Sequence, residues 1–168
     1  MPPDSPVERS YVVKRASPQE VYAVVVDVEA YPRLFPELKA VRIVERRPAA
    51  PGTPMVLRVE LRAQVVLAVR YVIDMRCDPD ALTVDWTFVE GDVVVDSRGA
   101  WRFTPEGEGT KTVYRVSLSV KAPLPGFVLR KATDALVSAS IPAMFASIER
   151  EVHRRRAAGP DTPGLPGT

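Results

Sequence analysis

Apolar and polar residues alternate along most of the chain between Leu38 and Lys121, with the period of two that is typical of strands. Short runs of glycine, proline and acidic residues interrupt this alternation and mark turns. The pattern predicts strands at residues 38–47, 54–62, 65–76, 81–88, 93–104 and 111–121, and a further short strand at residues 9–15. Because the turns are short, successive strands are expected to pair in an antiparallel meander.

The alternation separates an apolar face of the predicted sheet from a charged one. The charged face includes Arg58, Glu60, Arg70 and Asp74. A sheet with one apolar and one solvated face requires a cover over its apolar side. The predicted apolar face consists of Leu57, Val59, Leu61, Leu67, Val69, Tyr71, Ile73, Met75, Leu82, Val84, Trp86, Val95, Trp101, Phe103, Tyr114, Val116, Leu118 and Val120.

Two short helices are predicted between the first and second strands. The run Ser17-Pro18-Gln19-Glu20 has the features of a capping box, with Ser17 as the N-cap and Pro18 in the first helical position. This helix is expected to end near Asp27, which is predicted to cap a second, shorter helix through Tyr31. Pro36 prevents the second helix from continuing.

One long helix is predicted at residues 126–156, and it is the element available to cover the sheet. Its apolar residues form two stripes on nearly opposite sides, one through Val128 and Leu129 and the other from Ile141 to Val152. Pro142 lies where the stripes change over, so a kink or break is expected there. We predict that the bend turns both stripes toward the sheet. The alternative is that the second stripe binds a partner chain.

These elements predict an α+β fold, in which a curved seven-stranded antiparallel sheet wraps around a long C-terminal helix, with two short helices after the first strand. Residues 8–156 are expected to form one such domain. Residues 1–7 are predicted to be a disordered lead-in and residues 157–168 a flexible tail, because both segments are too poor in large apolar residues to order themselves.

Small residues on the predicted covering helix and around Ser97 and Gly99 lie opposite large aromatic residues, which leaves volume beneath the helix. This combination predicts an apolar cavity with a few polar groups, suited to an aromatic or isoprenoid ligand. The alternative is that the aromatic side chains fill this volume as core. The predicted ligand-binding residues are Phe35, Leu67, Val69, Tyr71, Trp86, Ser97, Trp101, Tyr114, Leu136, Ala139 and Met144.

The composition argues against several kinds of chemistry. The chain has one cysteine and one histidine, too few for an internal disulfide or a usual zinc site. It contains no phosphate-binding glycine loop and no metal-ligand spacing, so neither a cofactor nor a metal is predicted. A formal net charge of +2 does not indicate a nucleic-acid partner. The run His153-Arg154-Arg155-Arg156 is predicted to be a solvated helix end.

No catalytic residue is predicted. In the predicted register the apolar face carries no carboxylate, histidine or lysine, and general acid–base catalysis needs such a group near the substrate. A shift of one residue in register would bring Arg70, Asp74 or Arg98 onto this face, so the enzyme interpretation stays open.

The stretch SPQEVYAVVVDVEAYPRLFPELKAVRIVER, followed by GAWRFTPEGEGTKTVYRVSLSV and a long final helix, resembles the START-like (SRPBCC) superfamily. Within it, the polyketide cyclase/dehydrase and coenzyme Q-binding branch is the most similar. The resemblance covers residues 8–155, and its most specific part is the run from Asp27 to Pro36. It implies the helix-grip fold and the binding of lipids, sterols, quinones, polyketides or hormones, with catalysis in some members.

The favoured function is therefore non-catalytic binding or transport of a hydrophobic small molecule, such as a quinone, a lipid or a polyketide-like compound. The ligand is expected to enter between the C-terminal helix and residues 31–38, with Phe35 at the mouth. The first alternative is a polyketide cyclase, aromatase or dehydratase. The second is a protein-interaction or dimerisation module that uses the C-terminal helix. No apolar run spans a bilayer and no signal peptide is recognisable, so a cytoplasmic location is expected.

Overall fold

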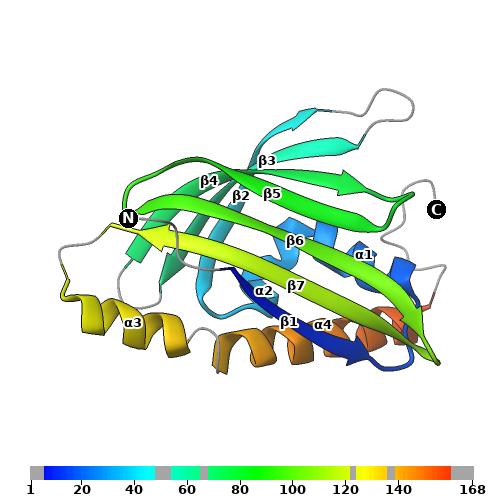
Figure 1. The fold of residues 1–168 in the computed structure, drawn as a ribbon. Coiled ribbons are helices and arrows are strands. Elements are labelled where there is room, and N and C mark those ends of the chain that lie inside the picture. Colours follow the sequence, from blue (N-terminus) through cyan, green and yellow to red (C-terminus); the bar gives the residue numbers. More distant parts are fainter. Residues whose placement is uncertain (1–5, 48–53, 65–67, 122–123, 136–138, 160–168) are drawn as a thin grey trace.

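Seven antiparallel strands form one curved sheet in the order β1-β7-β6-β5-β4-β3-β2, so β1 and β2 are its edges (Figure 1). The computed structural model describes residues 6–47, 54–64, 68–121, 124–135 and 139–159. The strands are β1 (Val7–Val13), β2 (Leu38–Arg47), β3 (Met55–Gln64), β4 (Ala68–Asp78), β5 (Thr83–Gly91), β6 (Val94–Glu106) and β7 (Gly109–Val120). The helices are α1 (Pro18–Val26), the 3-10 helix η1 (Val28–Ala30), α2 (Tyr31–Leu34), α3 (Gly126–Ala135) and α4 (Ile141–Ala158). This arrangement confirms the predicted helix-grip fold.

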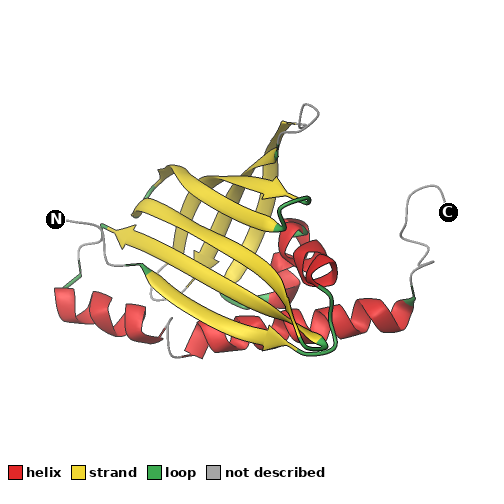
Figure 2. Ribbon diagram, turned by 45° about the vertical axis from the view of Figure 1, so that its right-hand side comes forward, coloured by secondary structure: helices red, strands yellow, loops and turns green. Residues whose placement is uncertain are grey.

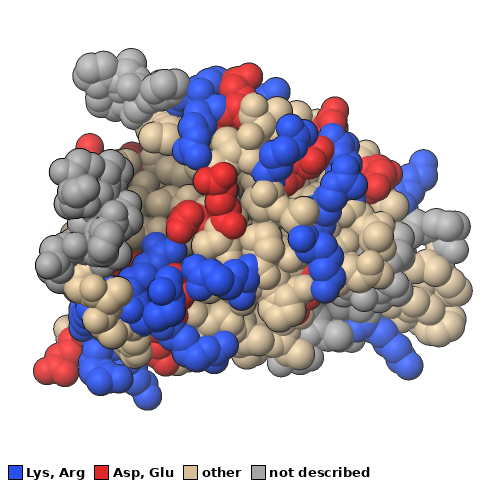
Figure 3. Space-filling model, turned by 180° about the vertical axis from the view of Figure 1, so that it is seen from behind, with Lys and Arg blue, Asp and Glu red and all other residues tan. Residues whose placement is uncertain are grey.

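The outer face of the sheet is charged, as predicted, and its charges are paired. Asp74 on β4 accepts hydrogen bonds from Arg58 Nε on β3 (2.9 Å) and from Arg47 Nη2 on β2 (3.0 Å). Glu60 on β3 accepts one from Arg70 Nε on β4 (2.7 Å). Seen from behind, basic and acidic side chains lie next to one another over much of the surface (Figure 3). Such pairs keep this face solvated and leave the other face for the core.

Helix α1 begins with the predicted capping box. Ser17 Oγ accepts a hydrogen bond from the Glu20 backbone N–H (3.2 Å), and Glu20 Oε1 accepts one from the Ser17 N–H (2.9 Å). The prediction that Asp27 caps the next helix is wrong, because its side chain makes no capping hydrogen bond to η1. Asp27 instead accepts a hydrogen bond from Arg155 Nη2 on α4 (2.7 Å), a partner that local sequence does not reveal.

The described helices lie on the concave side of the sheet, with α1 and α4 toward one end and α3 beneath the other (Figures 1 and 2). Helix α4 buries the apolar stripe predicted for the second half of the C-terminal helix: Ile148 is 0% exposed and Phe145 is 3% exposed. The stripe therefore packs against the chain's own core. The alternative that it binds a partner chain is wrong.

The described parts of the predicted C-terminal helix are α3 and α4, and residues 136–138 between them lie outside the described residues. Residues 139 and 140 form a π turn that leads directly into α4, and Pro142 lies in the first turn of α4. The expected kink or break at Pro142 therefore stays a prediction.

One predicted position on the apolar face is wrong. Val95 is 49% exposed, whereas Val94 is 2% exposed. The pairing of β6 with β7 shifts between Val94 and Asp96, so a bulge at Val95 turns this residue outward. Beyond the bulge the predicted alternation resumes, with Ser97 and Trp101 buried.

The predicted lead-in, residues 1–7, and tail, residues 157–168, lie largely outside the described residues, so these domain boundaries stay predictions. Helix α4 continues to Ala158, so its last two residues, Ala157 and Ala158, lie within the predicted tail.

Replacing Ile148 with Ala should lower the free energy of unfolding by about 3 kcal/mol, because it leaves a cavity in a fully buried helix–sheet contact. Val44→Ala is the matched control: Val44 is 45% exposed, and its truncation should cost less than about 0.5 kcal/mol. Urea denaturation of both variants measures the difference. Equal losses would contradict the packing of α4 described above.

Candidate ligand-binding site

The inner face of the sheet has a closed end and an open end. At the closed end the apolar side chains are fully covered, and Val59 and Val84 are 0% exposed. At the other end, where β3 leads into β4 and β7 finishes, Val94 is 2% exposed, but several inward apolar side chains are only partly buried. We call this group the open inner surface. It consists of Val69, Tyr71, Phe88, Val116, Leu118 and Val120.

Trp101 belongs to the packed core of the closed end. It is 5% exposed, and its ring centroid lies 4.5 Å from that of Tyr114 and 6.2 Å from those of Phe103 and Phe145. Edge-to-face and offset contacts of this kind stabilise a core beyond the area that they bury. Trp101 thus forms the packed floor next to the open inner surface.

Trp86 lies at the boundary between the two ends. Its Nε1 donates a hydrogen bond to Ser97 Oγ (3.2 Å), and its ring stacks on Tyr114 with centroids 5.9 Å apart. The indole lies over Gly99, where a Cβ would come within 2.2 Å of two ring atoms. Gly99 therefore provides the space that lets the indole lie against the sheet, and Ser97 fixes its orientation.

The hydroxyls of Tyr71 and Tyr114 are the polar groups of the open inner surface and its border. Neither hydroxyl has a hydrogen-bond partner among the described residues, and neither is fully enclosed. Burial raises the pKa of Tyr71 to about 12. Burial also raises the pKa of Tyr114, and the neighbouring Tyr71 adds to this shift. Both groups are protonated at neutral pH and can donate a hydrogen bond to a ligand.

The remaining predicted site residues lie around this surface. Phe35, at the end of α2, is partly buried against Tyr31, with ring centroids 5.0 Å apart. Met144 on α4 is partly buried and packs against the core, whereas Ala139 is exposed. Leu67 and Leu136 lie outside the described residues. The chain near Phe35 is tied to this end of the sheet, because the Gln64 N–H donates to the Glu37 carbonyl (2.8 Å).

No carboxylate, histidine or lysine is paired in register on the inner face of the described strands. Arg70, Asp74 and Arg98, the candidates for catalysis after a register shift, lie on the outer face. Each forms an ion pair there, Arg70 with Glu60 at 2.7 Å and Arg98 with Asp96 at 3.0 Å. The inner face of the described strands thus provides hydroxyls and aromatic rings rather than acid–base groups.

The described residues contain no cluster of three or more histidine, cysteine, aspartate or glutamate side chains suited to a metal. Two hollows, of about 320 and 400 Å³, are lined by charged and small residues of the outer face and of the β6–β7 turn. No predicted ligand-binding residue lines either of them. Neither hollow therefore competes with the open inner surface as the candidate site.

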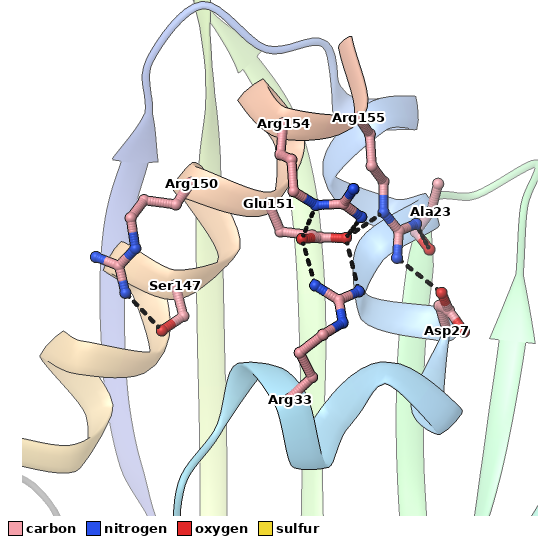
Figure 4. A network of polar contacts seen from close by, with 8 residues as sticks. All are labelled: Ala23, Asp27, Arg33, Ser147, Arg150, Glu151, Arg154 and Arg155. Carbon is pink, nitrogen blue, oxygen red and sulfur yellow. Dashed lines mark hydrogen bonds and ion pairs between the residues drawn. The ribbon is translucent and has the colours of Figure 1, made fainter. Parts of the chain in front are cut away.

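Buried Glu151 on α4 holds the closed end together (Figure 4). It is 3% exposed, and its carboxylate accepts two hydrogen bonds from Arg33 on α2 (3.0 and 3.1 Å) and two from Arg154 (2.9 and 2.7 Å). Arg155 donates a further one (2.8 Å) and reaches Asp27 after α1. These hydrogen bonds, those of Arg154 first, hold the pKa of Glu151 well below its usual range.

The predicted solvated helix end is therefore wrong for two of its arginines. Arg154 and Arg155 surround a buried carboxylate that joins α4 to α2 and to the end of α1. The signal in the sequence was Glu151 within a run of basic residues, with arginines three and four positions later. The bond from Arg33 could not be read from spacing, because it joins residues that are 118 positions apart.

The sequence profile of the family described as polyketide cyclase/dehydrase and lipid transport matches residues 15–145 of this chain. The chain belongs to this family, as its resemblance to the START-like superfamily implied.

Among the described helices, none is long and apolar enough to cross a membrane.

A curated relative, the actinorhodin polyketide synthase bifunctional cyclase/dehydratase of Streptomyces coelicolor, is 29% identical over 139 residues. The match covers 81% of this chain and 42% of the relative, so the chain spans less than half of the relative's length.

Two solved structures share the fold. The Zhui aromatase/cyclase from Streptomyces sp. R1128 has a TM-score of 0.77 and 24% identity, over 92% of this chain and 98% of that chain. A START superfamily protein from Mycobacterium smegmatis has a TM-score of 0.70 and 19% identity, over 89% and 98%. At these identities the likeness establishes the helix-grip fold.

Replacing Glu151 with Gln should lower the free energy of unfolding by about 2 kcal/mol at neutral pH, because three guanidinium groups lose their shared carboxylate. Arg33 and Arg154 are 54% and 59% exposed, and solvent screening keeps the loss below that of a fully buried pair. Since folding lowers the pKa of Glu151, its stabilisation is present above the ordinary carboxyl pKa and is lost as the pH falls below it.

Urea denaturation between about pH 7 and about pH 3 measures this contribution. The wild type should lose stability more steeply on acidification than Glu151→Gln does. Glu108→Gln, which removes an exposed carboxylate, should follow the wild-type curve. Parallel curves for the wild type and Glu151→Gln would contradict the role of the network.

Proposed function

We propose that this member of the polyketide cyclase/dehydrase family binds a hydrophobic small molecule that carries oxygen atoms, such as a quinone or a polyketide-like aromatic compound, on the open inner surface. The observation that carries the proposal is the pair of hydroxyls of Tyr71 and Tyr114, which have no hydrogen-bond partner among the described residues and are set among partly exposed apolar side chains. A buried polar group without a partner costs free energy, and a ligand oxygen would supply the missing hydrogen bond.

The apolar contacts alone favour a ligand of several fused rings. Burying about 300 Å² of apolar surface contributes about 7.5 kcal/mol before the cost of association. A micromolar dissociation constant corresponds to a binding free energy of about 8 kcal/mol. Burial of this apolar area therefore does not reach micromolar affinity by itself, and specific polar contacts must add to it. The two tyrosine hydroxyls are the groups that would supply such contacts and would give preference to oxygen-bearing ligands.

Binding without catalysis is supported by the chemistry of the inner face. On the inner face, the described strands carry no carboxylate, histidine or lysine that is paired in register, so this face lacks a proton acceptor of ordinary pKa. The family description includes lipid transport, which requires binding alone.

A second candidate function is cyclisation or dehydration of a polyketide-like substrate. It is favoured by the similarity to the actinorhodin cyclase/dehydratase and to the Zhui aromatase/cyclase. Protonated tyrosines could take part by donating hydrogen bonds to carbonyl groups and by holding a flexible chain in a folded shape.

Replacing Tyr71 or Tyr114 with Phe should weaken the binding of a dihydroxyanthraquinone about fivefold, because each change removes one hydrogen bond and little apolar area. Binding of anthracene, which has the same three-ring shape and no oxygen, should change less than twofold. Quenching of Trp86 and Trp101 fluorescence measures both affinities, and the chain has no other tryptophan.

Tyr22→Phe is the matched control, because Tyr22 packs on Phe103 away from the open inner surface. It should bind both compounds as the wild type does. If the wild type binds neither compound, the proposed site is wrong. If both Phe variants keep full affinity for the anthraquinone, the tyrosines are not the polar contacts.

The enzyme candidate is tested by incubating the protein with a linear poly-β-ketone thioester and following the products by mass spectrometry. Catalysis predicts protein-dependent loss of one water per ring closed, slowed at least tenfold in Tyr114→Phe. Substrate that binds and is recovered unchanged would favour the carrier function.

A further inference from the structure

Arg9 occupies an inner-face position on the edge strand β1. It pairs in register with Tyr114, and the residues on either side of it in the alternation, Val7 and Tyr11, pack against the core. The pairing of β1 with β7 has no shift, so Arg9 shares their face of the sheet. Side chains directly opposite each other on antiparallel strands have Cβ atoms about 5 Å apart. Arg9 is therefore the direct cross-strand neighbour of Tyr114.

The charge of Arg9 is not neutralised within the described part of the chain. Its one hydrogen bond runs from Nη1 to the carbonyl of Glu8 (2.8 Å), and no carboxylate of the described residues forms an ion pair with it. Arg46, the other arginine in register with an inner-face residue, lies at the closed end and pairs with Glu29 at 3.7 Å. Among the described inner-face residues that are paired in register next to the open inner surface, Arg9 alone carries a charge.

The start of α4 lies at the level of Arg9. Tyr11 stacks on Phe145, with centroids 5.5 Å apart, and donates a hydrogen bond to Glu149 (3.0 Å). Arg9 precedes Tyr11 by two strand residues, a distance of about 6.6 Å. The same distance along α4, which runs in the same direction, is about four helix residues, so Arg9 lies level with Ile141. Figure 1 shows the same arrangement, with the start of β1 near the start of α4. Arg9 therefore lies near the start of α4.

We propose that Arg9 binds a carboxylate at one end of the ligand, so that the preferred ligands are aromatic or polycyclic carboxylic acids. The inference rests on the proposed function. The apolar rings would lie on the open inner surface, the tyrosine hydroxyls would bind ligand oxygens, and the carboxylate would remain at the edge of the sheet. There Arg9 is exposed and the charged end of the ligand would keep contact with water.

A carboxylate suits this position better than a neutral oxygen. The planar guanidinium of arginine matches the two oxygens of a carboxylate, and such charge-assisted pairs are about twice as strong as neutral hydrogen bonds. Because the apolar surface next to Arg9 excludes part of the solvent, the pair is screened less than an ordinary surface ion pair.

The test compares anthraquinone-2-carboxylic acid with its primary carboxamide, which has the same size but no charge. Tryptophan quenching gives both dissociation constants for the wild type, Arg9→Gln, Arg9→Lys and the control Arg102→Gln. Arg102 is an exposed arginine on β6 that pairs in register with Val113, so it lies on the outer face. Thermal unfolding of each variant checks that the fold is retained.

The acid should bind the wild type about tenfold more tightly than the amide does. Arg9→Gln should remove this preference by weakening the acid alone, Arg9→Lys should keep part of it, and Arg102→Gln should keep all of it. An unchanged preference in Arg9→Gln, or an equal loss for acid and amide, would overturn the role of Arg9 and leave the proposed function intact. A wild type that binds neither compound would overturn both.

Discussion

The cover that α4 provides for the inner face of the sheet is the contact on which the rest of the structure depends. A curved sheet of seven strands presents more apolar surface than a helix of 18 residues can bury. Helix α4 packs Phe145, Ile148 and Val152 against one end of the sheet. The other end keeps apolar side chains partly exposed, at an unfavourable contribution of about 25 cal/mol per Å². A ligand that covers them would recover this free energy, so the incomplete cover links the fold to binding.

Glu151 explains why the two ends can differ so much. A buried carboxylate is costly unless it is paired, and here three arginines from two helices satisfy it while a fourth contact extends to Asp27. The network fixes α1, α2 and α4 relative to one another at the closed end. The ion pairs that the described helices form with other elements lie at this closed end.

Most of the fold could be predicted because it rests on local periodicity. The alternation of the strands and the capping box at Ser17 depend on neighbouring residues, and both were confirmed. The errors arose where contacts with residues distant in the sequence determine the local structure. The bulge at Val95 follows from pairing with β7, and Asp27 serves Arg155 rather than the helix that follows it. Pattern alone could not tell that Trp101 would pack as core while Tyr71 stays partly exposed, since both have the same alternation.

The same limit applies to the candidate site. Tyr71 and Tyr114 were predicted from their face, but their lack of partners is a property of the folded chain. Arg9 was not predicted, because a strand of seven residues at the edge gives too short an alternation to assign a face. Its position matters for the choice between carrier and enzyme. Raised pKa values keep both tyrosines protonated, and a guanidinium has only N–H donors, so all three groups donate hydrogen bonds. A site made of donors can orient and polarise carbonyl groups, yet it lacks a group that accepts a proton. Any ring closure here would therefore have to proceed by positioning, with water or the substrate itself as the base.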